Sequence, residues 1–446
     1  MSKFKHKNSY YIIRHKGSMS EFDVIVVGAG PAGASAAIRL ASNKVNVLLV
    51  DRADPPGSKN VSGGVLWGDS LSQVIPDWEK SNMLERYVEA KGVTFLTKDS
   101  KISIDFRSKK FGEYRSGYTV LRTKFDAWLA KKAKDAGAMV VSGVTVDKLA
   151  MKDGKVIGVE QGGETVTSDS VILAEGANSR VAYDSGIKKK PTDQKIALGV
   201  KEVIKLPEKA ITERFGLTSP KMGFASEYVL GFLEGGVRAG GFLYTNKESI
   251  SIGAVISMGD LRRNNQTYSF NVIEQFKDHP FIAPLLQDGR VEEYSAHLVP
   301  EGGLSVDSVY GNGYMIAGDT AGFTFSNGLV LQGMNYAVVS GIVAADSFME
   351  KKSKGGDMNF ENYKQNLEKT FVLKDMASFK GLDQVTWSET IHSTIPAIAE
   401  EAMLNIFSEN GNPKKHLSQI VISSALKQKD KRKDLAVDMY RMLRRM

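Results

Sequence analysis

The sequence of 446 residues contains no cysteine. This absence excludes disulfides, thiolate metal sites, dithiol redox chemistry and any iron–sulfur cluster held by this chain alone. The six histidines show no spacing typical of metal ligands, and the sequence has no His-Glu-x-x-His motif. Metal catalysis is therefore not expected, and an iron–sulfur cluster that serves this chain would have to belong to a partner.

Long apolar runs are also scarce. Residues 1–18 are polar and basic without an apolar core or a cleavage-type site, so we expect a disordered leader and no secretory signal. Residues 320–345 carry no charged side chain, but Asn327, Gln332 and Asn335 interrupt them. These polar residues favour a buried loop and helix over a membrane span.

Charge of one sign is not dominant, because 59 basic residues stand against 51 acidic ones and the net charge is +8. The densest basic stretch lies at the end, in residues 427–433 and at Arg441, Arg444 and Arg445. A solvated helical face is the simpler interpretation of this tail, and docking to an acidic protein or to anionic lipid is the alternative. We expect no nucleic-acid partner.

A glycine-rich turn follows the first apolar strand, Asp23–Val27, and precedes a helix of small residues. Gly28 permits the tight turn, Gly30 lets the backbone approach a pyrophosphate, and Gly33 brings the helix against the strand. The next strand ends at Asp51, roughly 20 residues on, where a carboxylate can accept hydrogen bonds from a ribose 2′-hydroxyl. This arrangement predicts FAD or NAD, not NADP. The cofactor-binding residues expected here are Gly28, Gly30, Pro31, Ala32, Gly33, Asp51 and Arg52.

A second glycine motif follows a strand late in the chain, in residues 313–322. Asp319 places a carboxylate beside an extended cofactor, where it can bind ribityl or ribose hydroxyls, and the loop from about Asn327 can direct N–H groups at a flavin carbonyl. An aspartate that satisfies its own turn would be the simpler interpretation if this motif stood alone. The residues expected to contact the cofactor here are Gly318, Asp319, Gly322, Gly328 and Leu329.

The order of elements predicts a divided nucleotide domain in a chain that exceeds one ordinary core. After the leader, residues 19–185 would form its first part, 186–299 a β-rich substrate domain, and 300–350 its second part. A helical region with the basic tail would occupy 351–446. The expected fold class is α/β, with a discontinuous FAD-binding Rossmann-like domain, an inserted antiparallel β-sheet domain and C-terminal helices.

Several segments resemble known flavoproteins. The motif Arg-x-x-Phe-Asp-x-x-Leu that begins at Arg122, together with the Gly-Asp motif at Asp319, resembles the FAD fold of para-hydroxybenzoate hydroxylase and geranylgeranyl reductase. In that group the arginine contacts FAD and the aspartate binds the ribityl chain. Residues 59–64 (Lys-Asn-Val-Ser-Gly-Gly), 297–303 and 318–322 are similar to the FixC flavoproteins, relatives of electron-transfer-flavoprotein:quinone oxidoreductase. Small residues let a backbone pass close to a planar ring, so the flavin's neighbours expected here are Ser62, Gly63 and Gly64.

The resemblance implies electron transfer through one bound FAD. FixC-like proteins work with electron-transfer-flavoprotein subunits and a separate ferredoxin-like iron–sulfur protein, and they pass electrons towards quinone. The resemblance therefore implies an FAD-dependent oxidoreductase that is cytoplasmic or peripheral on the inner face of the cell membrane. The chain departs from the family pattern at Asp51, where Glu is commoner, and at Glu175, which replaces the aspartate of an Asp-Gly pair.

Other functions of the same fold stay open. Prenyl lipid reductases of the geranylgeranyl reductase type share it, although their Tyr-x-Trp-x-Phe-Pro stretch is not found here, and FAD-dependent monooxygenases share it too. A scaffold that binds flavin without turnover is a third class. Residues 235–241 are glycine-rich but lack the strand, helix and acid of a nicotinamide domain, so a protein electron donor is expected.

No catalytic residue is assigned from the sequence. His297 and Glu301 could face the flavin, but hydrogen-bonded turn residues are the favoured interpretation. Residues 228–233 and 240–244 could line a quinone cleft or touch a bilayer, and core strands are the favoured interpretation there.

Overall fold

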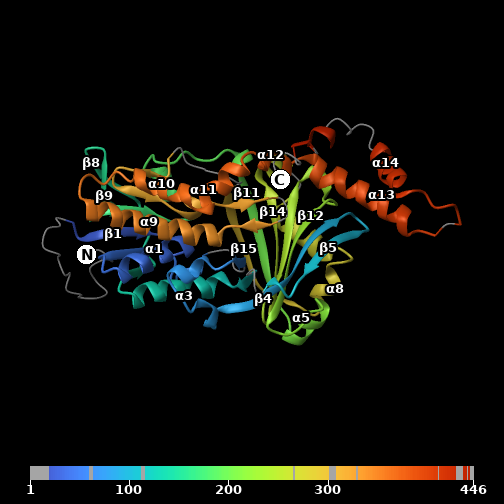
Figure 1. The fold of residues 1–446 in the computed structure, drawn as a ribbon, viewed down its shortest axis with the longest axis horizontal. Helices are drawn as coiled ribbons and strands as arrows, with labels where there is room; N and C mark the ends of the chain where they lie inside the picture. The colour runs from blue at the N-terminus through green and yellow to red at the C-terminus, as the bar shows by residue number, and fades with distance from the viewer. Residues whose placement is uncertain are drawn as a thin grey trace.

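The computed structural model describes residues 20–59, 64–111, 116–264, 267–300, 308–327, 330–409, 411–427, 435–438 and 440–441. Two large sheets lie one after the other along the long axis of the molecule, and C-terminal helices extend beyond the second sheet (Figure 1). The expected α/β class with a Rossmann-like sheet, a second sheet and C-terminal helices is confirmed. The expected leader and most of the basic tail lie outside the described residues.

The first sheet is mainly parallel and has the strand order β16-β17-β10-β1-β2-β7, with β8 and β9 attached to β10. Every residue of β1 is buried, because helices cover both faces of a parallel sheet and its strands are continuous apolar runs. β17 comes from late in the chain yet pairs with β10, so two separate segments build this sheet. Its strands are β1 (Phe22–Val27), β2 (Val47–Asp51), β7 (Met139–Ser142), β8 (Lys148–Lys152), β9 (Lys155–Gln161), β10 (Glu164–Leu173), β16 (Tyr310–Gly311) and β17 (Tyr314–Ile316).

Three helices pack around this sheet: α1 (Pro31–Ser42), α3 (Arg122–Asp135) and α9 (Met334–Lys354). α1 and α9 cross so closely that a Cβ on Gly341 would lie 2.0 Å from the carbonyl oxygen of Ala32. In the uncharged stretch 320–345, the described residues before α9 form a loop with two short strands, and the rest forms the buried first half of α9, as expected. Among the described residues, no helix combines the length and the apolar character needed to cross a membrane.

The second sheet is mostly antiparallel and has the order β15-β11-β14-β13-β12-β4-β6-β3, with β5 beside β4. Helix α7 (Ser269–Asp278) covers one face, where Val200, Ile252 and Phe276 belong to one apolar core. The opposite face is turned towards the first sheet. The strands are β3 (Gly64–Trp67), β4 (Leu84–Leu96), β5 (Lys101–Arg107), β6 (Gly117–Val120), β11 (Ile196–Lys205), β12 (Met222–Leu230), β13 (Ala239–Thr245), β14 (Ser249–Ser257) and β15 (Arg290–Pro300).

The sheet topology differs from the expected division of the chain in one respect. Residues 19–185 were expected to form one part of the nucleotide domain, but β3 to β6 from within this range pair in the second sheet. β4 lies parallel to β12, with Met222 opposite Tyr87, so the pairing joins residues far apart in sequence. The alternating burial of β4 suits a sheet with one covered and one partly exposed face.

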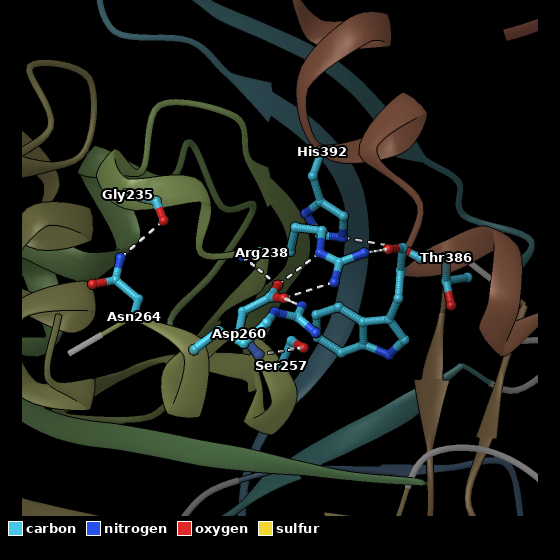
Figure 2. Close-up of polar contacts among 9 residues, drawn as sticks. Gly235, Arg238, Ser257, Asp260, Asn264, Thr386 and His392 are labelled. Atoms are coloured by element: carbon cyan, nitrogen blue, oxygen red, sulfur yellow. Dashed lines mark hydrogen bonds and ion pairs between the residues drawn. The ribbon is translucent and has the colours of Figure 1, made fainter. Parts of the chain in front are cut away.

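The C-terminal region is helical, as expected, and a buried ionic cluster anchors it to the second sheet (Figure 2). Asp260 is 4% exposed and accepts hydrogen bonds from Nε and Nη2 of Arg238 at 2.6 and 2.7 Å. Arg238 also donates to the carbonyl oxygen of Trp387, which lies just before a π-helical turn. In that turn His392 contacts the carbonyl oxygen of Thr386 through Nε2 at 2.9 Å.

The remaining elements are short or belong to the C-terminal region. The C-terminal helices are α10 (Glu361–Lys369), α11 (Phe371–Ser378), α12 (Asp383–Thr386), the π-turn η6 (Thr390–Thr394), α13 (Ile395–Phe407) and α14 (Leu417–Lys427). The short elements are η1 (Ser70–Gln73), η2 (Trp78–Lys80), α4 (Arg180–Asp184), η3 (Asp193–Lys195), α5 (Glu208–Arg214), η4 (Glu234–Gly236), α6 (Met258–Arg263), α8 (Ala283–Leu286), η5 (Gly318–Thr320), β18 (Phe325–Ser326) and β19 (Leu331–Gln332).

Candidate functional site

A cavity of about 450 Å³ lies between the carboxyl ends of the first sheet's strands and the inner face of the second sheet. Carboxyl ends of parallel strands are where nucleotides bind in this class of fold. Gly33 and Gly322 do not line the cavity, and Ser62, Gly63, Gly328 and Leu329 lie outside the described residues. The residues expected from sequence that line it are Gly28, Gly30, Pro31, Ala32, Asp51, Arg52, Gly64, Arg122, Gly318 and Asp319.

The three glycines of the first turn have different surroundings. Gly28 has a φ of +102°, and a Cβ there would lie 2.2 Å from the carbonyl oxygen of Ala174. A Cβ on Gly33 would lie 1.8 Å from the carbonyl oxygen of Gly28, so helix and turn touch through bare backbone. A Cβ on Gly30 would meet no atom closer than 3.7 Å, the Nη2 of Arg122. Gly28 and Gly33 are thus required by the fold, whereas Gly30 leaves open space on the cavity side.

Asp51 closes β2 and binds the glycine-rich turn. Its Oδ2 accepts a hydrogen bond from the amide of Ala29, and its Oδ1 accepts one from the amide of Ala53, both at 2.7 Å. Burial raises the pKa of Asp51, and these two amides oppose the rise. Each carboxylate oxygen has a second lone pair, so Asp51 can still accept a hydrogen bond from a ligand hydroxyl in the cavity.

Arg122 begins α3 and is held in place by Asp126, one helical turn later. Its Nε and Nη2 donate to the two carboxylate oxygens of Asp126, each at 2.8 Å, and the Asp126 side chain is fully buried. Burial opposes the charge of Arg122, but Asp126 and then Asp319 outweigh it and raise the pKa of the guanidinium. The charge therefore persists beside Gly30, where a pyrophosphate would lie.

Asp319 lies in η5, directly after β17, and its carboxylate lines the cavity. Burial raises its pKa, and the positive charges of Arg122, His297 and Lys188 oppose that rise. Within the described ranges, no group donates a hydrogen bond to its carboxylate oxygens. A partly buried acceptor without a donor fits a ligand that brings hydroxyl groups, such as the ribityl chain of FAD.

Near the cavity, the buried Lys188 was missed from the sequence, and Glu175 was noted only as a departure from the family pattern. Lys188 donates to the hydroxyl of Ser179 at 3.1 Å and to the carbonyl oxygen of Thr320 at 2.8 Å, and burial lowers its pKa to about 8. Glu175 accepts from two amides at the start of α4. A lysine that follows a short helix has no sequence signal, because its partner Thr320 lies more than 130 residues later, after β17.

The second sheet supplies the opposite wall, with Gly199, Phe242, Tyr244, Val255 and His297. The rings of Phe242 and Tyr244 are stacked with centroids 5.2 Å apart, and the Tyr244 hydroxyl donates to Oε1 of Glu227 at 3.1 Å. His297 contacts the carbonyl oxygen of Leu298 through Nδ1 at 2.7 Å.

The two segments considered for a quinone cleft are divided between this wall and the core. Tyr228 and Leu243 lie in the apolar core under α7, as the favoured interpretation expected, and no longer suggest a bilayer contact. Phe242 and Tyr244 face the cavity instead. His297 also lines the cavity, and Glu301 lies outside the described residues.

The chain was compared with known families and proteins. Residues 22–214 match the family profile of pyridine nucleotide-disulphide oxidoreductases, and residues 196–299 match the ubiquinone-binding profile of ETF-QO. A probable electron transfer flavoprotein-quinone oxidoreductase of Escherichia coli, YdiS, is 36% identical over 92% of this chain and 96% of its own length. Protein FixC of Bradyrhizobium diazoefficiens is 37% identical over 95% of this chain and 98% of its own length.

Solved structures with this fold are more distant in sequence. A geranylgeranyl bacteriochlorophyll reductase-like protein of Thermoplasma acidophilum has a TM-score of 0.66 at 19% identity and covers 94% of this chain and 99% of its own. The flavin-dependent brominase Bmp2 has a TM-score of 0.62 at 16% identity over 92% and 99% of the two chains. These structures show the fold alone. The high coverage and identity of the FixC and YdiS relatives place the chain in the FixC and electron-transfer-flavoprotein:quinone oxidoreductase family of FAD-dependent oxidoreductases.

Proposed function

We propose that the chain passes electrons between an electron-transfer flavoprotein, acting with a ferredoxin-like partner, and a membrane quinone. One observation carries the proposal: a single cavity has the nucleotide-binding residues on one wall and strands of the ubiquinone-binding segment 196–299 on the other. A quinone held on the second wall would lie against the flavin. Electrons would then need no further carrier within this chain.

FAD supplies the redox chemistry when bound, and the chain's residues hold it. Asp51 would accept hydrogen bonds from the ribose and Asp319 from the ribityl chain, since both line the cavity with free acceptor capacity. The N-terminus of α1, where Gly30 has no side chain to block the approach, would face the pyrophosphate. Arg122, fixed by Asp126, would place its positive charge beside the same group. These roles of the cofactor-binding residues, and the bounds of the domains that carry them, are part of the proposed function.

The test uses the purified FAD-loaded protein under anaerobic conditions, with the flavin absorbance band as the readout. NADH or NADPH is added first, then reduced electron-transfer flavoprotein with its ferredoxin-like partner, and finally a short-chain quinone. We expect bleaching only with the protein donor and recovery of the band with quinone. Prompt bleaching by a pyridine nucleotide alone would contradict the proposal and favour a prenyl reductase or a monooxygenase.

The membrane face that we propose lies on the C-terminal helical hairpin. α13 and α14 extend beyond the second sheet (Figure 1) and carry exposed apolar side chains. Phe407 is 78% exposed, and Leu404, Leu417 and Ile422 are more than half exposed. A cluster of large apolar side chains in contact with water is typical of an interaction surface, and delivery of a lipid-soluble quinone requires contact with a bilayer.

Vesicle sedimentation tests this face directly. We expect Phe407→Asp to lower the fraction bound to phosphatidylethanolamine and phosphatidylglycerol vesicles about tenfold, because burying a large apolar side chain stabilises by about 1.5–3 kcal/mol. Met151→Asp is the matched control, since Met151 is 51% exposed on β8 at the opposite end of the molecule (Figure 1). Equal binding by the two variants would place the membrane face elsewhere.

The basic tail stays a candidate docking segment for the protein donor. Lys427, its first residue, forms an ion pair with Glu401 at 2.5 Å, so a truncation that preserves α14 should begin after it. Removal of residues 428–446 should slow reduction by the electron-transfer flavoprotein at low salt, because attraction between opposite charges accelerates encounter. Unchanged donor kinetics would leave the tail as a solvated helical face.

A further inference from the structure

A tyrosine and a glutamate on the second sheet form a hydrogen-bonded pair that reaches the cavity. Tyr244 on β13 lines the cavity and is 6% exposed, and its hydroxyl donates to Oε1 of Glu227 on β12 at 3.1 Å. In the strand register Glu227 lies opposite Phe242. The ring of Phe242 stacks on the ring of Tyr244. Glu227 itself is partly exposed. The pair thus links a carboxyl that water can reach with a hydroxyl on the cavity wall.

Among the residues that the structure describes, no lysine, arginine or histidine forms an ion pair with the carboxyl of Glu227. The β4 residue opposite Glu227 is the apolar Val93. Lys91, two residues earlier on β4, has its ammonium 3.9 Å from the ring centroid of Trp67 and forms no ion pair with Glu227 within the described ranges. Beyond β4, strand β5 presents the apolar Ile104 and Phe106 to this side of the sheet. From β13 the apolar Phe242 lies opposite Glu227, and the titratable group of β13 that contacts it is the hydroxyl of Tyr244.

Burial therefore controls the protonation of both groups. It raises the pKa of Glu227 to about 7, with the hydrogen bond from Tyr244 opposing the rise. Burial, and then the charge of Glu227, raises the pKa of Tyr244 well above its ordinary value of 10.0, so the phenol keeps its proton. Glu227 can thus gain and lose a proton near neutral pH, while Tyr244 stays a hydrogen-bond donor. A hydroxyl can donate and accept at once, which is the property that a proton relay needs.

The chemistry proposed for the cavity requires protons as well as electrons. Reduction of a quinone to a quinol takes up two electrons, which the proposed function supplies through FAD, and two protons. The second-sheet wall offers two titratable groups among its described residues, Tyr244 and His297. His297 is hydrogen-bonded to the Leu298 carbonyl through Nδ1, and its charge acts on Asp319 at the cofactor side. Tyr244 is hydrogen-bonded to Glu227, whose carboxyl can replace the proton that Tyr244 gives up.

We propose that Tyr244 and Glu227 form the proton relay to the quinone, an inference that rests on the proposed function and deepens it. The Tyr244 O–H bond breaks as its proton moves to a quinone oxygen, and the proton of the Glu227 carboxyl moves to the Tyr244 oxygen. Water then reprotonates Glu227. Two passes supply the two protons that accompany the two electrons, and the protein returns to its starting state.

The first test measures the proton on Glu227 without any turnover. Infrared spectra of the FAD-loaded protein, recorded from pH 5 to 9 without quinone, should contain a protonated-carboxyl band that disappears with a midpoint near pH 7. The band should be absent in Glu227→Gln and present in Asp375→Asn. Asp375 is the matched control because it accepts a hydrogen bond from Tyr336 at 2.5 Å in a pair that does not line the cavity. Absence of a Glu227 band in wild type would overturn the relay.

The second test follows the protein-bound flavin, reduced beforehand with dithionite, as a short-chain quinone reoxidises it. The wild-type rate should fall as pH rises through about 7, because Glu227 must be protonated to supply the relay. Glu227→Gln and Tyr244→Phe should be slower on the order of 100-fold at pH 6 and lack this pH dependence, with KM for quinone little changed. Asp375→Asn should behave as wild type.

The outcomes separate the relay from the proposed function. If quinone does not reoxidise the wild-type flavin, the proposed function fails, and the infrared titration shows whether Glu227 holds a proton for another acceptor. If wild type reacts and both relay variants keep its rate and its pH profile, the relay is wrong although the proposed function stands. Loss of rate with an unchanged pH profile would also overturn it, because a merely structural role would produce that result.

Discussion

Replacing Asp260 with asparagine should release the anchor between the second sheet and the C-terminal helices (Figure 2). The carboxylate accepts from the amide, Nε and Nη2 of Arg238 at 3.1, 2.6 and 2.7 Å, and Arg263 also donates to it. Arg238 in turn donates to the carbonyl oxygen of Trp387. Asparagine keeps the shape of the side chain, but it removes the charge and replaces one accepting oxygen with an NH2 donor, so the variant loses the ion pair and at least one hydrogen bond.

The expected loss of folding stability depends on how deeply Asp260 and its arginine partners are buried. Removal of one partner from a buried ion pair costs about 3–5 kcal/mol, because the other charge stays buried without compensation. Asp260 is 4% exposed, but the side chains of Arg238 and Arg263 are 29% and 66% exposed, so water can rehydrate them in part. We therefore expect a cost below this range, about 2–3 kcal/mol of the free energy of unfolding.

Urea unfolding of the FAD-loaded protein measures this cost against a matched control. Asp193 pairs with Arg262 at 2.9 Å close by, but with side chains 34% and 67% exposed, so Asp193→Asn should cost less than about 1 kcal/mol. Protease cleavage near Trp387 should accelerate only in Asp260→Asn. Equal midpoints for the two variants would refute the reasoning, because burial would then not decide the strength of the pair.

The same variant predicts a pH dependence. Burial would raise the pKa of Asp260, but the hydrogen bonds and charges of Arg238 and Arg263 outweigh it and hold the pKa below its ordinary value of 3.8. A carboxyl with a lowered pKa in the folded state contributes stability that is complete above the unfolded value and is lost as pH falls through the folded one. The difference between wild type and Asp260→Asn should be constant from pH 7 to about 5 and narrow below 3.8.

Three further predictions concern the cofactor. Gly33→Ala should yield little folded, flavin-binding protein, because its Cβ would lie 1.8 Å from the Gly28 oxygen. Gly30→Ala has 3.7 Å of clearance, so without FAD it should have the same urea midpoint as wild type. Its affinity for FAD, measured by fluorescence titration, should be the property that falls. Asp319→Asn should raise the Kd for FAD about tenfold or more, since hydrogen bonds to a charged group contribute about 1.5–3 kcal/mol. Asp357→Asn, with a side chain 77% exposed, should leave that Kd unchanged. Removal of FAD should lower the free energy of unfolding by about 2.7 kcal/mol relative to protein in free FAD at 100 times its Kd. Equal urea midpoints with and without FAD would refute this.

The parts of the site that could be predicted are those whose chemistry is contiguous in sequence. Gly28, Gly30 and Gly33 lie within one short segment. A Cβ on Gly33 would clash with the backbone of Gly28, five residues earlier, and a Cβ on Gly28 would clash with the backbone of Ala174, just after the neighbouring strand β10. Asp51 is the last residue of an apolar strand, and Asp319 follows another. Local spacing is enough to place such residues at the carboxyl edge of a parallel sheet.

The parts that could not be predicted depend on pairing between distant strands. Tyr244 and Glu227 meet because β12 and β13 pair in a particular register, and a shift of either strand by one residue would turn its side chain to the other face. β4 joins the second sheet through β12, which follows more than 120 residues later, so no local pattern assigned it there. Loop closure over such distances is governed by the whole fold, not by the strands' own residues.

The connections between the two sheets decide how closely a quinone can approach the flavin. The chain leaves the first sheet after β10 and returns to it at β16, so the strands β11 to β15 lie between two crossings, as β3 to β6 do between β2 and β7. Ser179, in the crossing that follows β10, and Asp319, which follows β17, both line the cavity. Lys188 joins them, since its single ammonium group donates to the Ser179 hydroxyl at 3.1 Å and to the Thr320 carbonyl at 2.8 Å. One buried residue therefore ties the start of the inserted strands to the segment after β17, beside Asp319 and the other residues that would bind FAD.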